Sequence, residues 1–63
     1  METVEVFTKT LKKGDLVDMG HAVCTVHDID MGMVFMDDPT NDFSRIMILE
    51  EECPKVKKVI RRD

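Results

Sequence analysis

The sequence predicts an all-β fold of about five to six short antiparallel strands. Apolar and β-branched residues alternate with polar ones over short segments, and clusters of Gly, Pro, Asp and Asn separate those segments. The chain has 63 residues. A chain of this size has room for one small core, so we expect residues 1–63 to form a single small β domain.

The first half of the chain predicts three strands. Residues 3–10 alternate between apolar and polar side chains and end at a basic, glycine-containing turn. Residues 15–19 form the second strand, after which Gly20 lets the chain reverse. Residues 21–29 carry apolar groups on both sides. Such a strand is typical of the centre of a sheet or of a strongly curved position.

The second half predicts further strands and contains one ambiguous segment. Residues 33–36 are entirely apolar and are expected in the core, whereas residues 37–42 form an acidic turn. Residues 46–49 are apolar on all sides, which favours a buried strand. The alternative is a helix near 39–53, because one proline begins that stretch and another follows it. Residues 55–62 alternate well enough for a final strand.

The order of these segments resembles that of an SH3-like small β-barrel. The resemblance is carried by Lys13 to Val17, by Gly32 to Met36 and by Ile46 to Ile60, and it covers about residues 11–61. It concerns a fold and no specific family. Peptide-binding SH3 domains use an aromatic groove for proline-rich ligands. Because this chain has neither Trp nor Tyr, we do not expect that mode of recognition.

Composition excludes several classes of protein. Hydrophobic residues make up 43% of the chain and charged residues 35%, which is not the composition of a disordered segment. No apolar run approaches the roughly 20 residues that cross a membrane, and the first residues are acidic where a secretory signal is basic. We therefore expect a cytoplasmic protein without membrane contact. In that compartment Cys24 and Cys53 are expected to be free thiols.

Metal and cofactor sites are not expected. His21, Cys24 and His27 are three residues apart, a spacing that suits zinc on a helix. A strand through these residues instead places Cys24 on the face opposite both histidines. A calcium loop beginning at Asp28 is also rejected, because its Gly is at position five and position twelve is Pro39.

The chain is not expected to be an enzyme. It has no glycine-rich phosphate loop and no nucleophile motif. A pairing of Cys24 or Cys53 with His21 or His27 stays open as a nucleophile and base. Against it, a chain of this length rarely encloses a cavity of the roughly 300 Å³ or more that a typical ligand needs.

Charge is distributed unevenly along the chain. Residues 1–54 hold 4 Lys or Arg and 12 Asp or Glu, a net of −8, whereas residues 55–63 hold 5 and 1, a net of +4. The acidic part predicts a face complementary to a basic protein. The candidate partner-binding residues are Asp28, Asp30, Asp37, Asp38 and Asp42, with residues 50–52 beside them. The candidate phosphate-binding residues are Lys55, Lys57, Lys58, Arg61 and Arg62.

Two functional hypotheses follow. The first is a noncatalytic protein-interaction module, a small regulator or inhibitor that binds a partner protein through an edge strand or the acidic face, or that pairs with itself to cover Met and Phe side chains. The alternative is a nucleic-acid-binding regulator that uses the basic C-terminal strand. A structural interpretation of the same lysines is that they protect an exposed sheet edge from aggregation.

Overall fold

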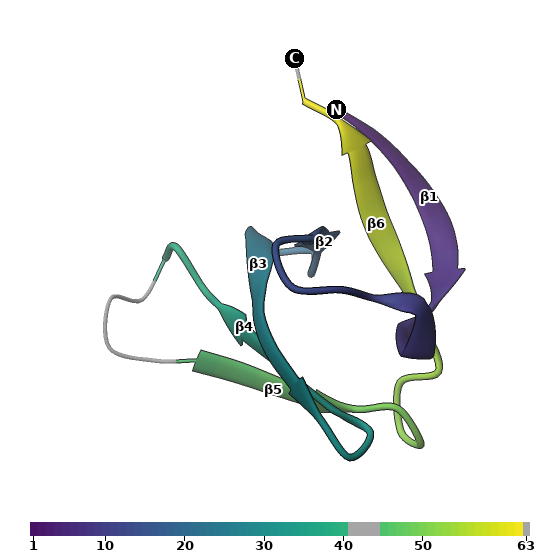
Figure 1. The fold of residues 1–63 in the computed structure, drawn as a ribbon. Coiled ribbons are helices and arrows are strands. Elements are labelled where there is room, and N and C mark those ends of the chain that lie inside the picture. Colours follow the sequence, from purple (N-terminus) through teal and green to yellow (C-terminus); the bar gives the residue numbers. More distant parts are fainter. Residues whose placement is uncertain (41–44, 63) are drawn as a thin grey trace.

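The computed structural model describes residues 1–40 and 45–62 and shows an all-β protein built from one curled antiparallel sheet (Figure 1). The fold class predicted from the sequence is confirmed. The elements are β1 (Glu2–Phe7), a 3₁₀ turn (Thr8–Thr10), β2 (Leu16–Asp18), β3 (Val23–Asp30), β4 (Met33–Asp37), β5 (Arg45–Leu49) and β6 (Lys55–Arg61).

The ambiguous segment contains a strand. Residues Arg45–Leu49 form β5 and pair with β4 along their whole length, so the helix considered near 39–53 is wrong. Four residues of that stretch, 41–44, lie outside the described part of the chain. A five-residue element with a four-residue apolar run is too short for a stable helix but matches the length of an ordinary strand.

The six strands follow the order β1-β6-β2-β3-β4-β5 and form a half-barrel (Figure 1). The consecutive strands β2 to β5 form a meander, after which β6 returns to pair with β2 on one side and β1 on the other. The edges of the sheet in the described residues are therefore β1 and β5. The interpretation of the C-terminal lysines as guards of a sheet edge is wrong, because β6 lies inside the sheet.

The core lies on the concave face of the sheet. Its buried side chains come from β2, β3, β4 and β6, and from the residue that follows the 3₁₀ turn: Val17, Cys24, Val26, Val34, Met36, Val56 and Leu11. Partly buried residues, among them Val6 of β1 and Ile46 and Ile48 of β5, complete it. Full burial of one such aliphatic side chain contributes roughly 1.5–3 kcal/mol, so this small set supplies most of the apolar driving force.

A bulge explains why the third predicted strand is apolar on both sides. Val26 pairs with Met36 and Asp28 pairs with Phe35, so His27 is an extra residue in β3. An extra residue reverses the alternation beyond it. Ile29 consequently pairs with Val34 and lies on the same face of the sheet as Val26. Without the extra residue, these two positions, three residues apart, would lie on opposite faces.

The first predicted strand ends three residues early, and the reason is a contact distant in sequence. Thr8 is 1% exposed. Its hydroxyl donates a hydrogen bond to the carbonyl of Cys53, and its N–H donates one of 2.8 Å to the carbonyl of Pro54. These two bonds attach the end of β1 to the connection between β5 and β6.

Within the described residues, no helix is long and apolar enough to cross a membrane.

Candidate functional site

Four apolar side chains lie on the convex face of β4 and β5, and we call them the β4–β5 apolar stripe. In β4, Val34 and Met36 are buried, so alternation turns Met33 and Phe35 outward. The β4–β5 register pairs Met33 with Leu49 and Phe35 with Met47. Met47 is the most exposed of the four, at 50%. The stripe is thus two adjacent cross-strand pairs on a surface that the described residues do not cover fully.

Carboxylates border this stripe along β3. The register pairs Asp28 with Phe35 and Asp30 with Met33, which places both acids next to the stripe. The N–H of Ile29, and then the ammonium of Lys13, lower the pKa of Asp28. The nitrogen of Lys13 is 3.4 Å from that carboxylate, and both side chains are well exposed. Asp28 therefore stays negatively charged at neutral pH.

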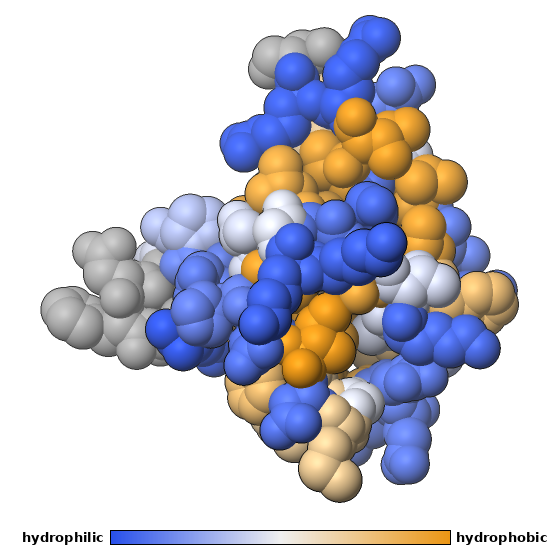
Figure 2. Space-filling model, in the orientation of Figure 1, coloured by the Kyte–Doolittle hydropathy of each residue, from blue (hydrophilic) through white to orange (hydrophobic). Residues whose placement is uncertain are grey.

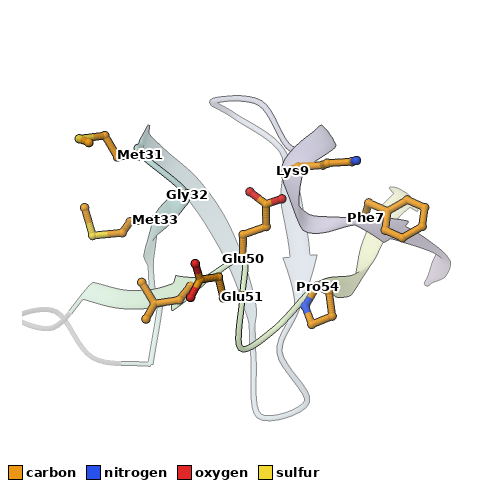
Figure 3. A pocket seen from close by; sticks show the side chains of 9 residues that line it. Phe7, Lys9, Met31, Gly32, Met33, Glu50, Glu51 and Pro54 are labelled. Carbon is orange, nitrogen blue, oxygen red and sulfur yellow. The ribbon is translucent and has the colours of Figure 1, made fainter.

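An open groove of about 620 Å³ continues from one end of the stripe. Its lining residues are Phe7, Lys9, Met31, Gly32, Met33, Leu49, Glu50, Glu51 and Pro54. In Figure 3 the methionines lie on one side and Phe7 and Pro54 on the other, with Glu50 between them. The groove is open and not enclosed, so it does not test the expectation that a chain of this length rarely encloses a cavity of ligand size.

The two edges of the sheet differ in chemistry. In β1, Glu2 and Glu5 carry charge and the ladder shifts register between Glu2 and Thr3, two features that disfavour pairing with another strand. In β5 the sequence is Arg-Ile-Met-Ile-Leu, and its pairing with β4 is regular. Its one charged residue, Arg45, is 3.3 Å from Asp37. Thus β5 is an apolar edge without the usual protection.

The structure describes four of the five aspartates predicted for partner binding and does not bring these four together. Asp28 and Asp30 border the stripe. Asp37 is instead engaged by Arg45 and by the ring of His27, whose Nδ1 is 3.6 Å away. Asp38, directly after Asp37 and the end of β4, contacts His21. The remaining candidate, Asp42, lies outside the described residues.

The basic residues of the C-terminal segment do not form a continuous positive surface. Lys55 is 3.8 Å from Glu5, and Lys58 is 3.7 Å from Asp15. Lys57 is registered opposite Glu5 on β1 and opposite Asp18 on β2. The end of the segment, Arg61 and Arg62, is exposed, and Arg61 is registered opposite Glu2. Neighbouring carboxylates therefore compensate much of this charge.

Apolar side chains also accumulate on the β1–β6 pair, and in Figure 2 they cover its upper part. Val4 and Ile60 are 43% and 55% exposed. At the other end of the pair, the exposed ring of Phe7 has the ammonium groups of Lys9 and Lys55 at 5.6 and 5.4 Å from its centroid. Sequence reasoning missed this ring because its neighbour Lys55 is distant in sequence.

The reasoning that separated Cys24 from the histidines is wrong for His21. Strand β3 begins at Val23, so His21 belongs to the preceding turn and strand alternation does not apply to it. His21 lies close to Cys24 and Asp38, whereas His27 contacts Asp37. Burial raises the pKa of the Cys24 thiol, and the nearby carboxylate of Asp38 raises it further. This environment does not activate Cys24 as a nucleophile.

The β4–β5 apolar stripe was not among the predicted sites, yet the sequence contained a signal for it. Residues 46–49 are apolar on all sides. If such a segment is a strand at a sheet edge, every second side chain must face away from the core.

Comparison of the chain with protein-family models, with curated proteins and with solved structures finds no match. The class that the fold defines is a small all-β half-barrel.

Proposed function

We propose that this chain is a noncatalytic protein-interaction module that binds an extended segment of a partner protein along β5. The observation that carries this proposal is the unprotected apolar edge of β5 next to the β4–β5 apolar stripe. An extended segment added to a sheet edge gains main-chain hydrogen bonds, and pockets for alternate side chains give specificity. Here the stripe supplies the surface for those alternate side chains.

The chemistry of the surface defines the partner segment. Asp28 and Asp30 border the stripe on one side, and Glu50 and Glu51 line the groove at its end. A segment with apolar residues at every second position and a Lys or Arg at the end beside Glu50 and Glu51 complements this surface, because Asp28 and Asp30 lie two strands away from the free edge of β5. Met47 is expected to contribute most to the binding free energy, since it is exposed in the free chain and lies on the edge strand. Methionine also adapts to irregular partners.

Selection of peptides from a displayed random library against the immobilised chain tests the proposal. We expect enriched peptides that alternate apolar residues and carry a basic residue at one end, beside Glu50 and Glu51. Met47→Lys should weaken their binding by at least tenfold, because changing a central anchor of an interface typically costs about 2 kcal/mol or more. Ile60→Lys is the matched control. Ile60 is similarly exposed, at 55% against 50% for Met47, but lies on β6, so its variant should bind as the wild type does.

Two results would overturn this proposal. The first is that the selected peptides bind the Met47→Lys and Ile60→Lys variants equally well. The second is that the wild type is a stable dimer at micromolar concentration and that Met47→Lys makes it a monomer. In that case a second copy of the chain, and not a foreign partner, occupies the edge of β5.

A second candidate function is binding of single-stranded nucleic acid, and the observation that favours it is Phe7. An exposed aromatic ring between two ammonium groups can stack a base while the lysines contact phosphates. Fluorescence anisotropy with a labelled oligonucleotide tests it. Phe7→Ala, and separately charge reversal of Lys57 and Lys58, should weaken binding, and the reversal should also flatten its dependence on salt. Unchanged affinity in both variants would exclude this function.

The SH3-like architecture and the cytoplasmic location belong to the same proposal. The meander β2 to β5 and the return of β6 to β2 support an SH3-like barrel to which β1 is added. The two free cysteines, Cys24 and Cys53, support a reducing compartment. An experimentally solved structure in which β6 does not pair with β2 would refute the architecture.

A further inference from the structure

Three side chains with metal-binding atoms meet where the β2–β3 turn approaches the end of β4. They are His21 in the turn, Cys24 on β3 and Asp38 directly after β4. One ligand atom from each residue lies within 4.8 Å of those of the other two. This cluster is separate from the β4–β5 apolar stripe and is independent of the proposed function.

Backbone geometry fixes the position of the histidine. The N–H of Met19 donates a 3.0 Å hydrogen bond to the carbonyl of Ala22, which closes a two-residue hairpin turn over Gly20 and His21. Gly20 has a φ of +92°, a left-handed value that glycine adopts without strain and that two-residue hairpin turns require. The tight turn sets His21 close to the start of β3, three residues before Cys24.

Strand pairing brings the carboxylate to the same place. Thr25 of β3 is registered opposite Asp37 of β4, so Asp38 comes beside Cys24. The N–H and the hydroxyl of Thr40 both donate hydrogen bonds to Asp38 Oδ1, at 2.9 and 2.6 Å. The other carboxylate oxygen, Oδ2, is 2.8 Å from Nε2 of His21. Hydrogen bonds of this kind orient a metal-binding carboxylate in known sites.

The cluster is accessible from one side only. Cys24 is fully buried, and the side chain of Asp38 is 10% exposed, whereas that of His21 is 51% exposed. A cation can therefore enter past the histidine and reach a thiol that water does not.

We propose that His21, Cys24 and Asp38 bind a zinc ion, with water as the fourth ligand. Imidazole nitrogen, thiolate sulfur and carboxylate oxygen are the ligand types that zinc takes in proteins, at about 2.0–2.3 Å. In a tetrahedral site these lengths separate neighbouring ligand atoms by about 3.3–3.6 Å. The His21 and Asp38 atoms must therefore move slightly apart, and the Cys24 sulfur must come slightly closer to them.

Binding changes the protonation of the cluster in a defined way. The zinc ion takes the place of the proton between His21 and Asp38, and in a neutral imidazole that proton moves to Nδ1 of the same ring. The Cys24 thiol loses its proton to form the zinc–sulfur bond. One proton from the thiol is released to solvent for each ion bound, and a second is released where His21 is charged beforehand. No oxidation or reduction takes place.

Titration with cobalt(II), a spectroscopic substitute for zinc, tests the site on the full chain. We expect near-ultraviolet absorption from a cobalt–thiolate bond, visible bands of tetrahedral intensity, and loss of both when zinc is added. Cys24→Ser should abolish the thiolate absorption. His21→Gln and Asp38→Asn should weaken affinity by at least about tenfold, since even indirect support of a ligand is worth 10–100-fold.

The chain provides a matched control for each ligand. Cys53→Ser, His27→Gln and Asp37→Asn replace residues of the same three types that lie outside the cluster, and these variants should bind cobalt as the wild type does. His21 is exposed at a turn, so His21→Gln retains the fold even where Cys24→Ser, in the core, does not. The proposal is overturned if excess cobalt gives no thiolate absorption, or if Cys53→Ser, and not Cys24→Ser, removes it.

Discussion

The attachment of β1 to the β5–β6 connection can be tested with one hydroxyl group. Thr8 is 1% exposed and its hydroxyl donates to the carbonyl of Cys53, 45 residues away. Thr8→Val keeps the shape of the side chain but removes the donor. The carbonyl loses its partner in a largely dry environment, which typically costs about 1–3 kcal/mol. With a urea slope of about 1 kcal/mol per molar for a small protein, the unfolding midpoint should fall by about 1 M or more.

Thr10 is the internal control for this measurement, because it belongs to the same 3₁₀ turn. Its hydroxyl also donates to a carbonyl, that of Phe7, at 2.7 Å, but the bond is local and exposed. Water replaces such a bond, so Thr10→Val should change the free energy of unfolding by no more than about 0.5 kcal/mol. Equal losses in the two variants, measured by urea denaturation followed by circular dichroism, would refute the argument that burial makes the Thr8 bond important.

Three further predictions concern the core and the β2–β3 turn. Met36→Ala should cost about 2–5 kcal/mol in urea denaturation, because Met36 is fully buried, whereas Val4→Ala, at a position 43% exposed, should cost far less. Gly20→Ala should cost about 1 kcal/mol or more, since its φ is +92° although no atom lies within 4 Å of an added Cβ. The hydrogen bond to Asp38 raises the pKa of His21 above its ordinary 6.5, and hydrogen bonds from Thr40 and then His21 lower that of Asp38 from 3.8 to about 2. In metal-free protein the His21–Asp38 pair should therefore stabilise the fold fully between pH 3.8 and 6.5. This stabilisation should be lost as pH rises through the raised pKa of His21, and also as pH falls towards 2, where Asp38 is protonated. In His21→Gln the free energy of unfolding should no longer decrease as pH rises above 6.5.

Local sequence patterns were sufficient for most strands. Residues 33–36 and 46–49 are short apolar runs, and both form strands because their length and β-branched content match a sheet better than a helix. The end of β1 was not predictable in this way. Threonine favours strands, yet β1 ends before Thr8, because the Thr8 hydroxyl donates a hydrogen bond to the carbonyl of Cys53, 45 residues away.

The candidate sites required information that single strands do not contain. The proposed metal-binding cluster depends on where β3 begins, and extending its alternation back from Val23 to His21 placed His21 on the wrong face. The partner-binding surface depends on which strands are edges, which is a property of the sheet order. Of the predicted acidic residues, Asp28 and Asp30 border that surface because β3 lies beside β4.

The position of β6 inside the sheet has a consequence for how the chain folds. Strands β2 to β5 can pair successively through local contacts as they are synthesised, but β1 has no neighbour in the described sheet except β6. Closing the long loop between β1 and β6 carries an entropic cost before any contact offsets it. Until residues 55–61 leave the ribosome, the chain is therefore an incomplete meander with β1 unpaired, and its last strand decides when folding becomes cooperative.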